Sequence, residues 1–302
     1  MQKKIIIGFG ELLWDILDNE KLLGGAPANF GYHCQQLNAD ARIVSAIGND
    51  DFGDEIIKHF NNKGLTTDYL QRIFNYPTGT VTVEVDVQGI PSYTIHEQVA
   101  WDHIEWNDTL EPLSKSADAI CFGSLSQRNL VSKTTLQKML GSVSKQCLKV
   151  FDINLRPPYY NTSILSESLQ LANIIKMNLE EAIIVGEMFN WGSDIPIIVK
   201  ELFKKFNFQL IAITCGEEGS KLFTPEQESF MKVNAVKISD TIGAGDSFTA
   251  ALVTGWLNQL PLAEIHKLAN NLSAYVCTQR GAMPSYKWNQ LVVDSRANEN
   301  VL

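Results

Sequence analysis

Short apolar segments alternate with amphipathic helical patterns along the 302 residues of the chain. The apolar segments have the length and residue types of buried strands, and they lie at 5–9, 43–47, 119–122, 150–153 and 210–214. Helical patterns lie between them, for example at 54–61 and 179–188. Because parallel strands need a long, usually helical, crossover, the alternation predicts a three-layer α/β/α core with a mainly parallel sheet.

One segment departs from this rhythm. Residues 80–87 alternate valine with polar residues, and Gly89 separates them from a second short strand-like run. Alternation of this kind is typical of an antiparallel ribbon with one exposed face. We therefore predict a small β-sheet lid, built from about 12–24 and 78–104, on a single domain that spans 1–302.

Charge and composition narrow the class of partner. Acidic residues outnumber basic ones by 34 to 25, and the net charge of -9 disfavours nucleic acid and anionic membranes as partners. The five cysteines are scattered, which is typical of reduced thiols. The apolar run after Lys3 and Lys4 is too short for a secretory signal, and no later stretch could span a bilayer. We expect a cytoplasmic protein with a small-molecule partner.

The segment 240–248, DTIGAGDSF, joins a glycine-containing turn to an amphipathic helix. Small residues at 243–245 allow close backbone approach, and the free amides of a helix start form an anion site. Asp246 lies beside this site. It either caps the helix or accepts a proton from an attacking hydroxyl, and a carboxylate next to an anion site favours the catalytic role.

A second glycine-containing segment, GGAPAN, lies at 24–29. Gly24 and Gly25 permit backbone contact with a ligand, and Asn29 offers both a donor and an acceptor for a hydroxyl. An ordinary turn before a helix is the alternative.

Polar residues also follow the apolar run near residue 150. Asp152, Asn154 and Arg156 alternate with apolar residues, so we expect them on one face at the end of a strand. Ligands of α/β proteins bind at such strand ends.

Two further patterns are ordinary structural signals when they are taken alone. Asn178 and Glu181 have the spacing of a capping box at a helix start. Thr214, Gly216 and Gly219 follow a strand, where backbone amides can meet phosphates, although the same pattern makes an ordinary turn. Neither GxxxxGK(S/T) nor a complete dinucleotide fingerprint is present, which argues against P-loop enzymes and dehydrogenases.

DTIGAGDSF is similar to the C-terminal signature of the ribokinase-like (PfkB) carbohydrate kinases. GGAPAN resembles their glycine-rich sugar-binding signature in the form typical of fructokinases, and GAMPS at 281–285 resembles their tail segment. The resemblance extends from about residue 5 to 287. It implies phosphoryl transfer from ATP, with Mg²⁺, to a sugar held between the core and the lid.

The resemblance also implies a set of roles for the residues of this chain. Asp246 is the catalytic base, and Gly243, Ala244 and Gly245 form the anion cradle. The predicted sugar site contains Asp15, Gly24, Gly25, Asn29, Trp101, Asp152, Asn154 and Arg156. Asp15, which follows Trp14, resembles the family's early sugar-binding carboxylate, and a solvated loop acid is its alternative. The predicted nucleotide site contains Asn178, Thr214, Gly216, Gly219, Asn271 and Ala274, while Glu181 holds Mg²⁺ through water. Asp240 and Ser285 map to a site for a monovalent cation such as K⁺.

The acceptor is suggested by the absence of cations. No Lys or Arg lies between Lys21 and Arg42 or between Arg72 and Lys115, whereas a phosphorylated acceptor normally needs one. Ala-Trp-Asp at 100–102 resembles fructokinase lids, so fructose is the predicted acceptor. 2-Keto-3-deoxygluconate is the alternative. A non-catalytic sugar- or nucleotide-binding regulator is an alternative of another class, and a hydride-transfer enzyme is a third. Relatives often pair through their lids, so a homodimer is expected.

Overall fold

The computed structural model describes residues 3–17, 20–85, 91–233 and 236–287. Over these residues the main sheet has nine strands. In chain order they are β1 (Ile5–Phe9), β4 (Asp40–Gly48), β5 (Leu70–Ile73), β8 (Ala119–Phe122), β9 (Leu148–Asp152), β10 (Ile174–Asn178), β11 (Leu210–Thr214), β12 (Ser220–Phe223) and β13 (Glu228–Met231). Their spatial order is β13-β12-β11-β10-β9-β8-β1-β4-β5, and only the pairs that include β12 are antiparallel among these described strands. The predicted, mainly parallel sheet is confirmed.

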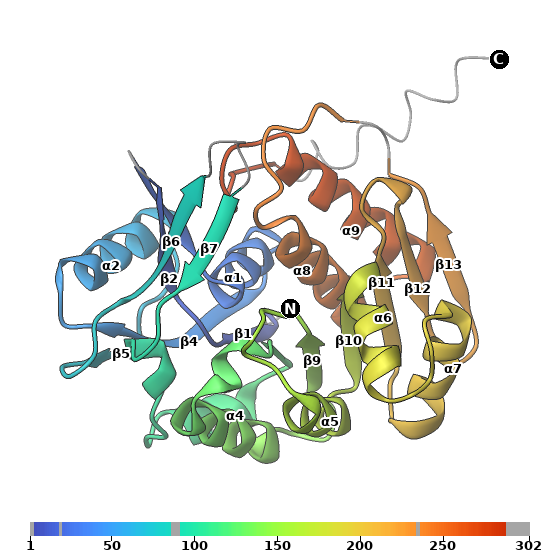
Figure 1. The fold of residues 1–302 in the computed structure, drawn as a ribbon, viewed down its shortest axis with the longest axis horizontal. Coiled ribbons are helices and arrows are strands. Elements are labelled where there is room, and N and C mark those ends of the chain that lie inside the picture. Colours follow the sequence, from blue (N-terminus) through green and yellow to red (C-terminus); the bar gives the residue numbers. More distant parts are fainter. Residues whose placement is uncertain (1–2, 18–19, 86–90, 234–235, 288–302) are drawn as a thin grey trace.

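Helices cover both faces of this sheet (Figure 1). They are α1 (Ala26–Gln36), α2 (Asp51–Lys63), α3 (Leu110–Ser116), α4 (Leu130–Ser142), α5 (Thr162–Leu171), α6 (Leu179–Met188), α7 (Ile195–Lys205), α8 (Ala244–Leu257) and α9 (Leu262–Cys277). Apolar side chains of α3 to α7 pack on one face, and those of α1, α8 and α9 pack on the other. Burial of both faces explains why the strands are apolar along their whole length.

Strand boundaries agree closely with the apolar runs in three cases, β1, β8 and β11. The strand β10 was missed by that pattern because Lys176 interrupts its apolar run. The strand β9 ends at Asp152, so the predicted continuation through Ile153 is wrong. Both differences lie next to the candidate site.

A second, four-stranded sheet projects from the core (Figure 1). Its described strands are β2 (Leu13–Leu17), β3 (Glu20–Gly24), β6 (Gly79–Val85) and β7 (Pro91–Ile95), in the order β3-β2-β6-β7. The antiparallel pairing of β6 with β7 was predicted, while Gly89 and residues 86–87 lie outside the described residues. The predicted lid segment is too long at its end, because 100–103 forms a 3₁₀ turn, η1 (Ala100–His103), packed against β4.

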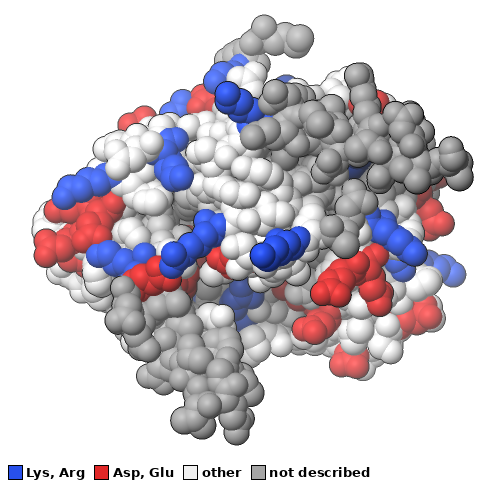
Figure 2. Space-filling model, turned by 90° about the horizontal axis from the view of Figure 1, so that it is seen from above, with Lys and Arg blue, Asp and Glu red and all other residues white. Residues whose placement is uncertain are grey.

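Acidic and basic side chains are interspersed among uncharged ones on the face seen in Figure 2. No helix within the described ranges combines the length and the apolar character that a bilayer crossing requires.

Candidate active site

The start of α8 has an unusual backbone conformation. Gly243 is the N-cap residue at φ 77°, and it makes no side-chain cap hydrogen bond. A Cβ at this position would lie 2.6 Å from the Cβ of Ala282, so glycine is required by both conformation and space. Asp246 lies in the first turn, three positions after this cap. The alternative that Asp246 is merely the N-cap is therefore wrong.

Free backbone amides lie at this helix start. The Ala244 amide donates to the carbonyl of Thr241 at 3.3 Å, and the first intrahelical bond runs from Ser247 to Gly243 at 2.9 Å. The amides of Gly245 and Asp246 precede that bond and lack an intrahelical acceptor. A Cβ on Gly245 would lie 2.8 Å from Nζ of Lys176, so an ammonium group lies next to these amides. The arrangement suits an anion.

Asp246 itself is held by a distant part of the chain. The Asn29 side-chain amide of α1 donates to Oδ2 of Asp246 at 2.9 Å, across 217 positions of sequence. Burial raises the pKa of Asp246 to about 6, and the charge of Asp152 adds to the increase. The Asn29 hydrogen bond and the cations of Lys176 and Arg156 act in the opposite direction. The carboxylate is thus ionised at neutral pH, yet more basic than an exposed aspartate.

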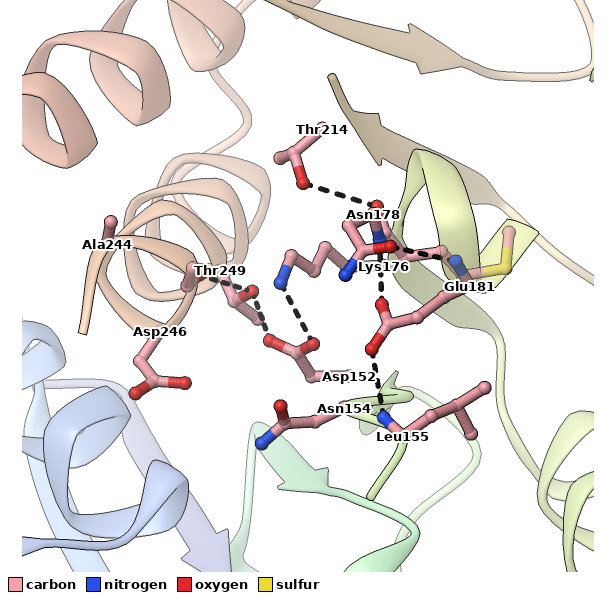
Figure 3. Close-up of polar contacts among 12 residues, drawn as sticks. Asp152, Asn154, Leu155, Lys176, Asn178, Glu181, Thr214, Ala244, Asp246 and Thr249 are labelled. Atoms are coloured by element: carbon pink, nitrogen blue, oxygen red, sulfur yellow. Dashed lines mark hydrogen bonds and ion pairs between the residues drawn. The ribbon is translucent and has the colours of Figure 1, made fainter. Parts of the chain in front are cut away.

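A buried ion pair of Asp152 with Lys176 acts on the pKa of Asp246. Figure 3 shows the Asp152 carboxylate between Lys176 and Thr249. Lys176 Nζ lies 3.2 Å from Oδ1, and the Thr249 hydroxyl donates to Oδ2 at 2.7 Å. Burial acts to lower the pKa of Lys176, but Asp152, Glu181 and Asp246 outweigh it and raise that pKa. Lys176 therefore stays charged, and both Asp152 oxygens are already engaged.

The expected alternation of Asp152, Asn154 and Arg156 on a strand is wrong. Only Asp152 belongs to β9, and Asn154 has a left-handed backbone with φ 41°. Arg156 is exposed, with its Nη1 donating to the Leu155 carbonyl at 3.0 Å. Its charge still acts on the pKa of Asp246, so the three residues remain near one another despite the broken pattern.

Two glycines at the end of β3 allow close approach of oxygen atoms, a carboxyl oxygen at Gly24 and a backbone carbonyl at Gly25. A Cβ on Gly24 would lie 2.6 Å from Oδ2 of Asp15, and one on Gly25, at φ 116°, would lie 2.5 Å from the Glu11 carbonyl. Burial raises the pKa of Asp15 to about 6, while Arg156 acts to lower it. Gly24 therefore lies against Asp15, and the Asn29 amide donates to the Gly25 carbonyl at 3.1 Å. Their role in binding a sugar stays a prediction.

Glu11 is a candidate that the motifs did not reveal. Its side chain is buried, and Oε2 has no hydrogen-bond partner among the described residues. Burial raises the pKa of Glu11 to about 7, with a smaller contribution from Asp246, while hydrogen bonds with the Glu11 and Ala26 backbone and the charge of Arg156 lower it. Asn29 Oδ1 is likewise buried without a described partner. Glu11 lies just after the end of β1, where ligands of α/β proteins bind, and this position is the signal that could have identified it.

Trp101, a residue of the predicted sugar site, differs in exposure from Tyr93 on β7. Trp101 is fully buried, and the Arg128 guanidinium lies 4.0 Å from the centroid of its ring. Trp101 therefore has no ring face open to a sugar in this structure. Tyr93 on β7 is 64% exposed and is free to contact a ligand.

A cavity of about 710 Å³ lies beside the start of α8. The predicted nucleotide residues Asn178, Thr214, Gly216, Gly219 and Ala274 all line it. It is lined as well by Ala244, Gly245, Phe248, Glu217, Ser220, Val233, Val236, Ile238, Thr241, Asn270, Ser273 and Cys277. Asn271 is not among these lining residues; the neighbouring Asn270 takes that place on α9. The cavity therefore joins an apolar chamber to the free amides of α8.

Asn178 and Glu181 form a full capping box at the start of α6. Each side chain accepts the other residue's amide at 2.8 Å. The second oxygen of Glu181 accepts the Leu155 amide at 2.9 Å. Within the described residues, no group of three or more His, Cys, Asp or Glu side chains could hold a metal ion. Water-mediated binding of Mg²⁺ by Glu181 stays a prediction.

Asp240 and Ser285 are both engaged by protein groups. Asp240 accepts the amides of Ile242 at 3.0 Å and Gly281 at 3.1 Å. The Ser285 hydroxyl shares a 3.2 Å hydrogen bond with Tyr32, and its carbonyl accepts from Tyr275 at 3.1 Å. A monovalent cation at these residues also stays a prediction.

Comparisons with known proteins show the family and the fold of this chain. The model of the pfkB family carbohydrate kinases matches residues 2–289. An uncharacterized sugar kinase of Pyrococcus horikoshii is 29% identical over 98% of this chain and 97% of its own length, and its structure matches with a TM-score of 0.82. Escherichia coli fructokinase is 25% identical over 88% of this chain and 89% of its own. The structure of a Xylella fastidiosa fructokinase with bound ATP is 22% identical, with a TM-score of 0.85 over 96% of this chain and 97% of its own. The chain belongs to the pfkB family of carbohydrate kinases.

Proposed function

We propose that this carbohydrate kinase transfers the γ-phosphoryl group of ATP to a primary hydroxyl of a neutral sugar, with fructose as the preferred acceptor. The observation that carries the proposal is the Asp246 carboxylate, with a pKa raised to about 6, in the helix turn whose amides are free. A base and an anion site adjacent to each other are what in-line transfer to a hydroxyl requires.

In this proposal Asp246 removes the proton of the attacking hydroxyl, while Asn29 holds the carboxylate in position. The amides of Gly245 and Asp246 and the ammonium group of Lys176 stabilise charge on the transferring group. The cavity beside them has an apolar chamber for the nucleoside part of ATP. Mg²⁺ would neutralise the phosphates when bound, with Glu181 as its water-mediated protein contact.

The charge near the base supports a neutral acceptor. The carboxyl groups of Glu11 and Asp15 lie with Asp246 around one cation, Arg156, which acts on the pKa of all three. An anionic acceptor would meet repulsion from such a set, whereas sugar hydroxyls can donate to it. The Oε2 atom of Glu11 and the Oδ1 atom of Asn29 are suitable acceptors for those hydroxyls. The similarity to the E. coli fructokinase also supports fructose as the proposed acceptor.

A substrate panel tests this proposal. We expect fructose to give the highest kcat/KM with Mg-ATP among ketoses, ribose, nucleosides, phosphosugars and 2-keto-3-deoxygluconate. A clear preference for fructose 6-phosphate or a nucleoside would contradict the charge-based reasoning. Preference for 2-keto-3-deoxygluconate would instead assign Arg156 to its carboxylate. Binding of sugar and ATP without ADP release would favour the non-catalytic regulator.

A further inference from the structure

A chain of side-chain hydrogen bonds runs into the nucleotide cavity from β13. Ser229 Oγ lies 2.8 Å from Nδ1 of His266, and Nε2 of that ring lies 2.8 Å from Oγ of Ser220 on β12. The Ser220 hydroxyl then donates to Oδ1 of Asn270 at 2.6 Å. His266 and Asn270 lie one turn apart on α9, which packs along β12 and β13 (Figure 1).

The direction of each hydrogen bond in this chain follows from the last one. Since the Ser220 hydroxyl donates to Asn270, its oxygen is left to accept a proton from Nε2 of His266. Burial lowers the pKa of His266 to about 4, although a hydrogen bond to the Ser220 backbone opposes this, so the ring is neutral at pH 7. Its Nδ1 is then an acceptor for the Ser229 hydroxyl.

One polar atom at the end of the chain has no partner. Asn270 is 8% exposed, and its Nδ2 makes no hydrogen bond within the described part of the chain. Asn270 and Ser220 both line the cavity, together with the apolar side chains of Val236 and Ile238. A buried amide donor without an acceptor is costly, and a ligand acceptor in the cavity removes that cost.

We propose that Ser229, His266 and Ser220 are positioning residues that fix the Asn270 amide so that its NH₂ group donates to an acceptor of the bound nucleoside. The acceptor is a purine ring nitrogen or a ribose oxygen, because the proposed function assigns the transferring phosphoryl group to the free amides at the start of α8. This inference rests on the proposed binding of ATP. It assigns part of the enzyme's nucleotide selectivity to a network that starts outside the cavity.

Calorimetric titration with ATP, 3-deaza-ATP, 7-deaza-ATP and 2′-deoxy-ATP tests the donor. In the wild-type protein, one analogue should bind about tenfold more weakly than ATP, as expected for one buried hydrogen bond. In Asn270→Leu that difference should vanish, and ATP itself should bind about tenfold more weakly. The three analogues distinguish the two ring nitrogens from the ribose hydroxyl. If Asn270→Leu binds ATP as the wild type does, or keeps the same discrimination, the proposal is wrong.

A second variant covers the case in which leucine prevents folding. Asn270→Asp keeps the side-chain shape but replaces the donor with an acceptor, so it should also lose the discrimination between ATP and the analogue. Retained discrimination in a folded Asn270→Asp protein would overturn the proposal.

The positioning residues are tested by the ratio of the Kd of the discriminated analogue to the Kd of ATP. Loss of folded protein alone does not change this ratio. His266→Phe keeps an aromatic ring but breaks the chain, so the ratio of the two Kd values should fall severalfold toward one. Ser229→Ala, at the far end, should reduce it less than Ser220→Ala does. Ser142→Ala on α4, whose hydroxyl bonds only the Lys138 carbonyl among described groups, is the matched control and should not change the ratio. An unchanged ratio in His266→Phe would remove the network from nucleotide binding.

These measurements separate the two proposals because they use binding and not turnover. If the sugar panel shows no phosphorylation but the analogue ratio depends on Asn270, only the proposed kinase activity fails. If fructose is phosphorylated but the ratio does not depend on Asn270, only the positioning network fails.

Discussion

The two sides of the site differ in the kind of polar group that they hold. The proposed sugar side gathers Glu11, Asp15 and Asp246, carboxyl groups whose pKa values are raised by burial to between about 6 and 7. The proposed nucleotide side is a cavity with apolar side chains, backbone amides and neutral polar side chains, and Glu217 is the one acidic residue among the described residues that line it. We therefore expect proton transfer on the side with the carboxyl groups. On the other side, the shape of the cavity and the fixed amide dipoles would bind the ligand. Changes on the sugar side should alter kcat and its pH dependence, while changes in the cavity should alter nucleotide affinity.

Asp246→Asn should have the largest effect. Removal of the proton acceptor should lower kcat by about 10²–10⁴-fold or more, with much smaller changes in the affinities for ATP and sugar. The fold should survive, because Gly243 and not Asp246 caps the helix, and Asn29 can still bond the new amide. Steady-state kinetics and thermal unfolding check both statements. Exposed Asp51 on α2 provides the control variant Asp51→Asn. Wild-type turnover in Asp246→Asn would refute the mechanism.

Arg156→Lys should have the next largest effect. The guanidinium acts on the pKa of Glu11, Asp15 and Asp246, and a lysine cannot reproduce its planar fork. We expect transition-state stabilisation, measured as kcat/KM for the sugar, to fall by roughly 1–3 kcal/mol. Arg42→Lys, at the Asp40 ion pair on β4, is the control. Near-wild-type kinetics would exclude Arg156 from the site.

The pH dependence should report the base directly. Asp246 acts in its ionised form, and its pKa is raised to about 6, so kcat/KM should rise with pH to a plateau above that value. At pH 5 the rate should be about a tenth of the plateau, because one proton must leave the base. The Glu11→Gln variant should show the same rise of kcat/KM with pH. If the rise disappears in this variant, it belongs to Glu11 and not to Asp246. A flat profile from pH 5 to 8 would contradict the base assignment.

A pair of glycine variants should show a smaller effect. Gly243 and Gly192 have nearly the same φ angle, 77° and 80°, but of these two only a Cβ at 243 would lie within 4 Å of other atoms, those of Ala282. Gly192→Ala should lower the free energy of unfolding by about 1 kcal/mol through its φ angle, with kcat unchanged. Gly243→Ala should cost about 1–3 kcal/mol more because of the clash, with a few-fold loss in kcat. Equal unfolding free energies in denaturant titrations would show that contact with Ala282 is unimportant.

Local patterns predicted the fold well. The strands β1, β8 and β11 end where their apolar runs end, because both faces of the sheet are buried. The glycines of the GAGD and GGAPAN segments predicted unusual backbone conformations, and Gly243 and Gly25 indeed have positive φ values that favour glycine.

Other parts of the site depend on residues that meet only in the folded chain. The pKa of Glu11 and the charge of Lys176 arise from burial among distant segments, which no spacing in the sequence encodes. The alternation at 152–156 failed because Asn154 leaves the strand conformation. On α9, Asn270 lies one turn before Ala274, so both residues face the cavity. The motif comparison predicted Asn271 instead, which is one residue away.

The N-cap at Gly243 places a limit on stabilising this enzyme. A side-chain cap typically contributes about 1 kcal/mol to a helix, and α8 forgoes it at a position where a capping side chain would point at the anion cradle. A Ser or Asp at 243 would also have to adopt the left-handed backbone and displace Ala282. Thermostability and turnover therefore oppose each other at this residue, and consensus or design methods that reward helix caps should leave it unchanged.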